Sequence, residues 1–126
     1  MPKKKTSSRK NLVKRLDTVV SLYIRERDKR CVQCGSVENL TNGHVFTRRY
    51  HSTRWDISKD GNCHTQCWSC NYKHGWQPLE YYNWYIGEFG QEKFDELYQR
   101  HKQITKLTNN DLKELLEEIN GKRKND

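Results

Sequence analysis

The chain has 126 residues, a formal net charge of +8, and nearly as many charged residues (32%) as hydrophobic ones (33%). This length suits one domain. A composition this hydrophilic cannot fill a large apolar core, so we expect the fold to need a staple, that is, a stabilising cross-link such as a bound metal. No apolar run approaches the roughly 20 residues of a membrane span, and no apolar stretch follows the basic N-terminus. We therefore expect neither a membrane helix nor a secretory signal.

The positive charge is concentrated at one end of the chain. Residues 1–30 hold 11 basic and 3 acidic residues, whereas residues 78–126 hold 8 basic and 10 acidic residues. Such asymmetry is typical of a nucleic-acid-binding surface, with a solubilising tail as the alternative. Residues 1–9 are predicted to be a disordered basic tail.

Residues 10–30 are predicted to form a basic amphipathic helix. Apolar residues recur there at three- and four-residue spacing, which marks one buried face. Lys14 and Arg15 fall on the outer face, where they are candidates for contact with DNA. The apolar positions are Leu12, Leu16, Val19, Val20, Tyr23 and Ile24.

Residues 31–77 are predicted to form a zinc-stapled core. The stretch "CVQCGS" indicates a tight knuckle, in which Gly35 supplies the unusual backbone angle of the turn. The stretches "LTNGHVF" (40–46) and "NCHTQC" (62–67) predict two strand arms, joined by an exposed basic loop. A helix is expected to begin near the second CxxC pair.

Residues 78–126 are predicted to be helical, because their apolar residues again follow the helical repeat. The expected limits are Pro78 to Gly90, residues 94–101, and a last helix capped at Asn109 or Asn110 and ended by Gly121. The predicted fold class is therefore small α+β, with a zinc-organised centre flanked by an N-terminal helix and C-terminal helices.

The cysteines predict the metal. Cys31 and Cys34 form one CxxC pair, and Cys67 and Cys70 form a second pair after 32 intervening residues. Without a secretory signal, two such pairs favour zinc over disulfides. Four thiolates fill a tetrahedral zinc site, so this zinc would be structural, and its binding free energy would be folding free energy. Cys63 is left over and is expected to be a small buried strand residue.

Three further residues stand between or beside the cysteine pairs: His44, Asn62, and Asn71 directly after Cys70. This arrangement resembles the HNH, or ββα-metal, nuclease motif in its His-Asn-Asn form. The resemblance implies a treble-clef core in which two strands and a helix surround one divalent ion. It also implies that His44 is the general base and that Asn62 braces the loop and orients His44. Asn71 would be a ligand of catalytic Mg²⁺ or Mn²⁺ and would lie opposite His44.

These residue types suit phosphodiester hydrolysis. The reaction needs a water deprotonated near neutral pH, and imidazole, with an ordinary pKa of about 6.5, can accept that proton. It also needs relief of the charge that builds on the phosphate and the leaving oxygen. A hard cation held by oxygen ligands, such as the carbonyl of an asparagine side chain, supplies that relief.

The resemblance can be narrowed to one family. The stretches "YIRERDKRCVQCG", "GHVFTRR", "TRWD", "NCHTQCWSCN" and "IGEFGQEKFDELYQR" are similar in order and spacing to the phage NinG family of recombination endonucleases, which includes phage lambda Rap. Phage endonuclease VII, a Holliday-junction resolvase, has similar zinc pairs followed by asparagine. The resemblance implies cleavage of branched DNA, a homodimer joined through the later helices, and action in the cytoplasm of the bacterial host.

The sequence departs from many HNH enzymes at Gly43, where those enzymes carry an acidic metal ligand. The second protein ligand of the catalytic ion is therefore open. Asp56 is the first candidate, with His64 behind it; the alternative for Asp56 is a salt bridge with Arg54 or a loop cap. Water and phosphate oxygens could complete the coordination.

Arg48, Arg49 and Arg54 lie in the loop beside the predicted site. They are candidates for contacts to phosphate, because guanidinium groups bind it bidentately; a solvated loop is the alternative. Two other functions fit the same features. One is an HNH enzyme that nicks linear duplex DNA, and the other is a zinc-stabilised DNA-binding module without catalysis.

Overall fold

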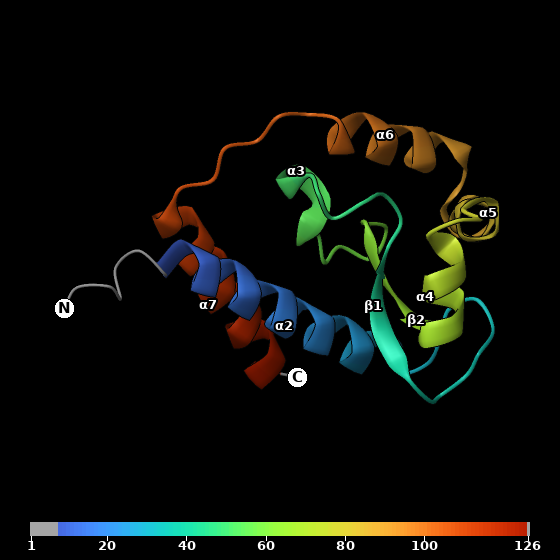
Figure 1. Ribbon diagram of the computed structural model, residues 1–126, viewed down its shortest axis with the longest axis horizontal. Coiled ribbons are helices and arrows are strands. Elements are labelled where there is room, and N and C mark those ends of the chain that lie inside the picture. The colour runs from blue at the N-terminus through green and yellow to red at the C-terminus, as the bar shows by residue number, and fades with distance from the viewer. Residues whose placement is uncertain (1–7, 126) are drawn as a thin grey trace.

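The computed structural model describes residues 8–125, in which six helices surround one two-stranded antiparallel sheet (Figure 1). The predicted tail lies mostly outside this range, and the first helix, α2 (Ser8–Asp28), begins before the predicted residue 10. Its apolar stripe is buried as expected: Leu12, Leu16 and Ile24 are at most 4% exposed. No helix within residues 8–125 is long and apolar enough to cross a membrane.

The sheet is the hairpin predicted between the cysteine pairs. Strand β1 (Leu40–His44) runs antiparallel to β2 (Cys63–Cys67), with Leu40 opposite Cys67 and His44 opposite Cys63. The segment between the strands, predicted as an exposed loop, contains a short helix, α3 (His51–Arg54). Thr53 and Trp55 are buried there, so part of this segment belongs to the core and not to the solvated surface.

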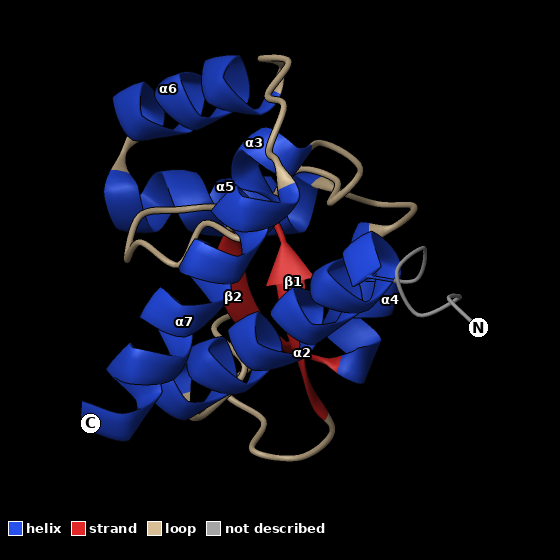
Figure 2. Cartoon of the chain, turned by 90° about the vertical axis from the view of Figure 1, so that its left-hand side faces the viewer, coloured by secondary structure: helices blue, strands red, loops and turns tan. Residues whose placement is uncertain are grey.

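Helices cover both faces of the hairpin. Helix α2 packs on one face, and α4 (Trp68–His74), which starts directly after β2, packs on the other and contacts α5 (Leu79–Phe89) (Figures 1 and 2). As predicted, α5 ends at Gly90, whose φ of 97° is accessible to glycine at little cost. Helix α6 (Gln91–His101) then returns over α3.

The last helix, α7 (Asn109–Asn125), packs side by side with α2. Its N-terminus is capped by Thr108 and Asp111, each of which accepts a hydrogen bond from the other's backbone N–H, so the predicted cap at Asn109 or Asn110 is wrong. The helix also continues past Gly121, the predicted end. Its apolar residues Leu112, Leu116 and Ile119 are buried against α2 of the same chain and are therefore not free for a second copy.

The apolar residues form two clusters, one on each side of the hairpin. The first joins α2 and α7 with Trp55 and Cys63, and the second joins Val45 and Phe46, which follow β1, with α5 and α6. Cys63 is fully buried, as predicted for a small strand residue. The hairpin is thus fixed from both sides by packing, and its alternating side chains enter different surroundings.

Candidate functional site

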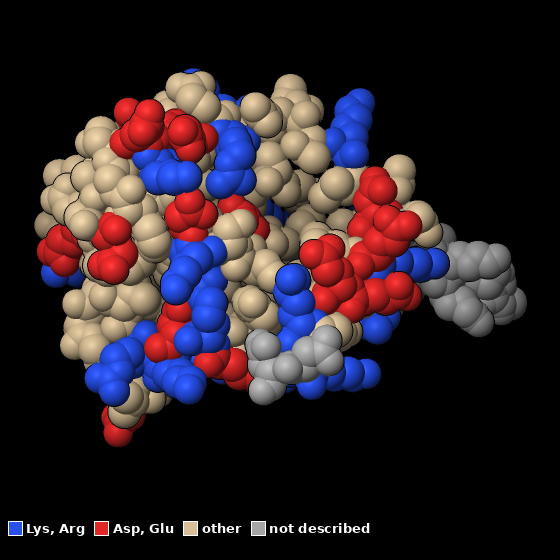
Figure 3. Space-filling view, turned by 180° about the vertical axis from the view of Figure 1, so that it is seen from behind, with Lys and Arg blue, Asp and Glu red and all other residues tan. Residues whose placement is uncertain are grey.

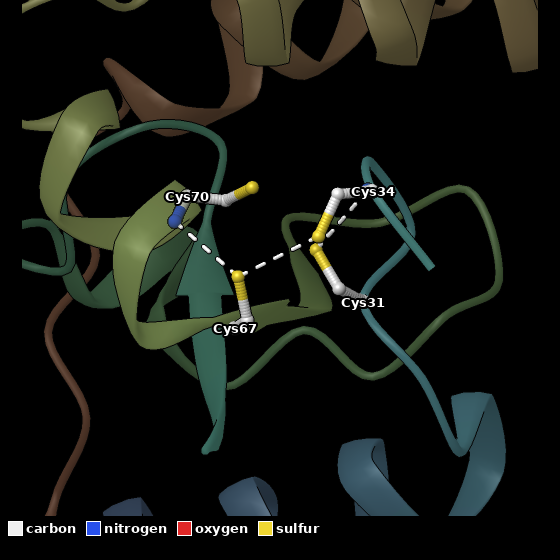
Figure 4. A group of neighbouring side chains, drawn as sticks. All are labelled: Cys31, Cys34, Cys67 and Cys70. Carbon is white, nitrogen blue, oxygen red and sulfur yellow. Dashed lines mark hydrogen bonds between the residues drawn. The ribbon is translucent and has the colours of Figure 1, made fainter. Parts of the chain in front are cut away.

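The four paired cysteines come together at one end of the hairpin. The knuckle brings Cys31 and Cys34 toward Cys67, the last residue of β2, and Cys70, in the first turn of α4 (Figure 4). All four sulfur atoms lie within 4.8 Å of one another, and those of Cys34 and Cys67 are 3.7 Å apart. A tetrahedral zinc with Zn–S bonds of about 2.3 Å requires sulfur separations of about 3.8 Å. The cluster can therefore hold a structural zinc, as predicted.

His44 ends β1, and the backbone of the following segment fixes its orientation. Its Nε2 lies 3.0 Å from the carbonyl oxygen of Arg54. A carbonyl only accepts hydrogen bonds, so Nε2 carries the proton and Nδ1 keeps the lone pair. Burial lowers the pKa of His44 to about 4, while the Arg54 carbonyl opposes that shift. His44 is therefore a neutral imidazole at neutral pH, with one nitrogen able to accept a proton.

A cavity of about 150 Å³ adjoins His44 on the α2 face of the hairpin. Its wall includes two guanidinium groups, from Arg48 and Arg54, and the side chain of Asn42, whose buried Oδ1 has no hydrogen-bond partner within the described part of the chain. The space exceeds the roughly 30 Å³ that one water molecule occupies in the liquid. The remaining lining residues are Asp17, Val20, Ser21, His44 and Trp55.

Asp17 neutralises part of the positive charge in this cavity. Its carboxylate accepts hydrogen bonds from Arg54 Nε and Nη2, at 3.0 and 2.6 Å, and from Trp55 Nε1 at 2.8 Å. Burial alone would raise the pKa of Asp17, but these hydrogen bonds outweigh it and hold the pKa below its usual value. Arg48 is more exposed and lies 3.7 Å from the same carboxylate.

Asn62 makes the bracing contacts that the resemblance implied. Its side chain is fully buried, its Oδ1 accepts from the Phe46 N–H at 2.8 Å, and its Nδ2 donates to the Phe46 carbonyl at 2.9 Å. The same Nδ2 lies 3.3 Å from the carbonyl of Thr53, the residue before Arg54. Asn62 thereby ties the segment that carries the Arg54 carbonyl to the start of β2.

The structure does not bring Asn71 into the cavity beside His44. Side chains alternate along a strand, so His44 and Asn42 share the α2 face, whereas Thr41 and Gly43 belong to the opposite one. Asn71 lies on α4 and donates from Nδ2 to Thr41 Oγ1 at 3.0 Å. Asn71 thus does not line the cavity beside His44, and the meeting of the two side chains at one phosphate stays a prediction.

A second polar group lies on the α4 face around Gly43. A Cβ at Gly43 would stand 2.0 Å from Gln66 Oε1, so the Gln66 amide fills the space that a larger residue would take. Gln66 Oε1 and His74 Nδ1 are both buried and, among the described residues, neither has a hydrogen-bond partner. His74 Nε2 bonds the Val45 carbonyl at 2.9 Å, which leaves Nδ1 as the acceptor.

The structure does not support Asp56 or His64 as ligands of a catalytic ion. Asp56 Oδ1 accepts from the backbone and hydroxyl of Ser58, which is the loop cap. Its Oδ2 pairs with Arg100 at 3.1 Å and not with Arg54, the predicted partner, which binds Asp17. His64 is 2% exposed and uses both ring nitrogens, toward the Gly61 carbonyl and Arg27. Neither residue lines the cavity beside His44.

The predicted DNA-contacting residues differ in their freedom to bind phosphate. Arg54 is committed to Asp17, whereas the side chains of Arg48 and Arg49 are exposed. Lys14 and Arg15 are also exposed, on a groove between α2 and α7. Basic and acidic side chains interleave over the face seen in Figure 3, so no single-signed surface covers that side.

Asp17 and Asn42 are among the cavity residues that were not predicted from the sequence. Asp17 carried a usable signal, because it stands between Val13 and Val20 at helical spacing and therefore on the apolar stripe of a basic helix. A carboxylate at such a position needs a buried partner. Asn42 carried no comparable signal, since asparagine is ordinary in a partly exposed hairpin.

The fold and the cysteine cluster define a small α+β protein organised around a site that can hold zinc. A family model described as "Bacteriophage Lambda NinG protein" matches residues 1–126, the whole sequence. The chain therefore belongs to the NinG family of phage proteins. No curated protein and no solved structure matches it.

Proposed function

We propose that this chain is a metal-dependent endonuclease of phage recombination that hydrolyses phosphodiester bonds in branched DNA, such as Holliday junctions. The observation that carries the proposal is the neutral His44 imidazole, fixed by the Arg54 carbonyl and facing a cavity with two guanidinium groups. Membership of the NinG family supports an association with phage recombination.

In this proposal His44 Nδ1 accepts a proton from the attacking water. Asn42, in the wall of the same cavity, would help to orient that water. Arg48, which is exposed although it lies 3.7 Å from Asp17, and the exposed Arg49 would hold the DNA backbone. Asn62 would keep the Arg54 carbonyl in place for His44. As the water oxygen bonds phosphorus, the P–O3′ bond breaks and the departing 3′-oxygen takes a proton from solvent, while His44 gives its own proton up to solvent.

Asn71, on the α4 face, would hold the divalent cation through its amide oxygen, a ligand that both Mg²⁺ and Mn²⁺ accept. Bound there, the ion would supply charge relief at the phosphate. Strand β1 lies between Asn71 and His44. For both residues to act on one phosphodiester, the scissile phosphate would have to lie at the end of β1, where the two faces of the hairpin meet.

The separation of Asn71 from His44 favours one competing function, a zinc-stabilised DNA-binding module without catalysis. Such a module needs the cysteine cluster and exposed basic residues but gives His44 no chemical task. It predicts DNA binding that is unchanged in His44→Ala and Asn71→Ala, without turnover in any metal.

Cleavage of matched substrates tests the proposal. Wild-type protein, His44→Ala and the control His51→Ala are incubated with Mg²⁺ or Mn²⁺ and labelled four-way junction, flap and linear duplex of one sequence. We expect junction cleavage to fall at least a hundredfold in His44→Ala and to persist in His51→Ala, with zinc content unchanged in both. Preferred cleavage of linear duplex would instead indicate a nicking enzyme, and no cleavage by the wild type would refute an endonuclease.

A resolvase must cut two strands, so the proposal includes a homodimer. The buried face of α7 is taken by α2, whereas Trp68, Tyr72, Trp76 and Leu79, on and just after α4, are each at least 60% exposed. Sedimentation of the protein alone and with a junction measures whether two copies assemble. Only monomers in both samples would contradict paired cutting.

A further inference from the structure

Asp17 is connected to His44 through a short series of contacts. Its carboxylate binds the side chains of Arg54 and Trp55, two adjacent residues at the end of α3. The backbone carbonyl of Arg54 in turn receives the proton of His44 Nε2 at 3.0 Å. Asp17 comes from α2, an element remote in sequence from all three residues, so it anchors the α3 end to the helix across the cavity.

The contacts of Asp17 exclude simpler roles for it. Both carboxylate oxygens accept hydrogen bonds from Arg54, and a second cation, Arg48, lies 3.7 Å away. A divalent ion at Asp17 would face two guanidinium groups, so a metal-ligand role is electrostatically disfavoured. The Trp55 indole N–H also donates to the carboxylate. Asp17 therefore holds two side chains and does more than neutralise the charge of Arg54.

A carbonyl that holds an imidazole in one tautomer works only if the carbonyl itself is held. Asn62 binds the neighbouring Thr53 carbonyl, and the Cys63 thiol lies 3.4 Å from the Arg54 oxygen. Neither contact fixes the Arg54 and Trp55 side chains, which Asp17 does with a bidentate fork and an indole hydrogen bond. The orientation of the Arg54 peptide therefore depends on a residue of another helix.

We propose that Asp17 is the positioning residue of the His44 site: by holding Arg54 and Trp55, it fixes the Arg54 carbonyl and so keeps the lone pair of His44 on Nδ1. This inference rests on the proposed function for its kinetic consequence, but its structural content concerns the tautomer of His44 alone. The same carboxylate offsets the charge of Arg48 and Arg54, so its removal affects DNA binding and turnover in opposite directions.

The Asp17→Asn variant tests both consequences. It retains a similar shape and one acceptor oxygen but removes one negative charge from the cavity. We expect at least a tenfold fall in kcat with a severalfold gain in junction affinity, because the free guanidinium attracts phosphate while the base loses its orientation. Glu26→Gln, which removes a negative charge from an exposed ion pair on the same helix, should leave kcat unchanged. Binding and turnover that fall together in Asp17→Asn would indicate only a damaged fold and overturn the positioning role.

Nitrogen-15 spectra of histidine-labelled protein at neutral pH provide a readout without cleavage. His44, assigned with His44→Ala, should be the Nε2–H tautomer in the wild type and a mixture in Asp17→Asn. If Asp17→Asn does not fold, Arg54→Lys breaks the same fork while keeping the charge, and it should show the same mixture. A single Nε2–H tautomer in both variants refutes the inference. A mixed tautomer in a protein that never cuts DNA would refute the nuclease proposal and leave this inference intact.

Discussion

The two faces of the hairpin carry different groups of side chains, although both are built from the same two strands. Successive residues of each strand point to opposite faces. The α4 face holds Asn71, Gln66 and His74, next to the cysteine cluster that fixes the start of α4. The α2 face holds His44 and Asn42 in a cavity closed by Asp17 and α3. The cysteine cluster therefore orders one face directly, whereas the candidate base depends on packing between segments remote in sequence.

The largest expected effect comes from breaking the staple. Cys67→Ser should abolish zinc binding and unfold the domain, because three remaining thiolates hold zinc poorly and the binding energy is folding energy. Circular dichroism measures the loss of folded structure, and a metal assay measures the zinc bound per chain. Cys63→Ser makes the same chemical change at a buried cysteine outside the cluster, so it should keep its zinc and melt only a few degrees lower. A folded Cys67→Ser without zinc would show that the staple is dispensable.

A smaller effect is expected where Asn62 joins the hairpin to the α2-face segment. Asn62→Ala leaves the backbone N–H and carbonyl of Phe46 without partners, whereas the Thr53 carbonyl keeps the backbone N–H of Asp56; the two lost partners should lower the free energy of unfolding by about 2–4 kcal/mol. Urea unfolding measures the loss. The exposed Asn83→Ala on α5 is the control and should change it by less than about 0.5 kcal/mol. Equal stability of the two variants would remove the bracing role.

Acid should weaken both faces, since burial lowers the pKa of His44 on one and of His64 on the other to about 4. The unfolded chain, with histidine pKa values of about 6.5, then binds more protons than the folded chain. Stability is therefore complete above about pH 6.5 and falls as the pH drops toward 4, by at most about 1.4 kcal/mol per pH unit for each histidine.

Urea unfolding at several pH values between 5 and 7, with zinc present, measures this slope. His44→Gln and His64→Gln should each remove part of it, and the remainder comes from His51 and His74, whose pKa values burial also lowers. Cleavage should show no acid limb between pH 6 and 8, because a base with a pKa of about 4 is already deprotonated there. An unchanged unfolding slope in His44→Gln would contradict the burial of a neutral imidazole.

The smallest effect concerns exposed charge beside the cavity. Replacing Arg48 and Arg49 together by alanine should lower the slope of log affinity against log salt by up to about 2, with little change in the melting temperature. Lys122→Ala with Lys124→Ala, at the far end of α7, is a control with the same charge change. A larger loss of slope in the control would place the DNA on α7 and not beside His44.

Local patterns determined much of this protein in advance. The two CxxC pairs predicted the metal cluster, because ligand type and spacing are local properties, and helical periodicity predicted α2, α5 and α6 from single stretches of sequence. Asn62 was recognised through a resemblance, and its bracing contacts are present. The cap at the start of α7 was predicted wrongly, and the partners of Asp56 and His64 were not predicted, since apolar spacing does not reveal contacts to Thr108, Arg100 or Arg27.

The sequence by itself therefore determined the cysteine cluster, the hairpin and the order of helices, all of which follow from spacing along the chain. Only the tertiary structure decided that His44 turns toward α2 while Asn71 stays with α4, and that Asp17 enters the His44 cavity. Strand alternation makes the two faces different, but the face that each helix covers is set by which apolar stripes fit together. That choice involves residues far apart in sequence, and no local pattern contains it.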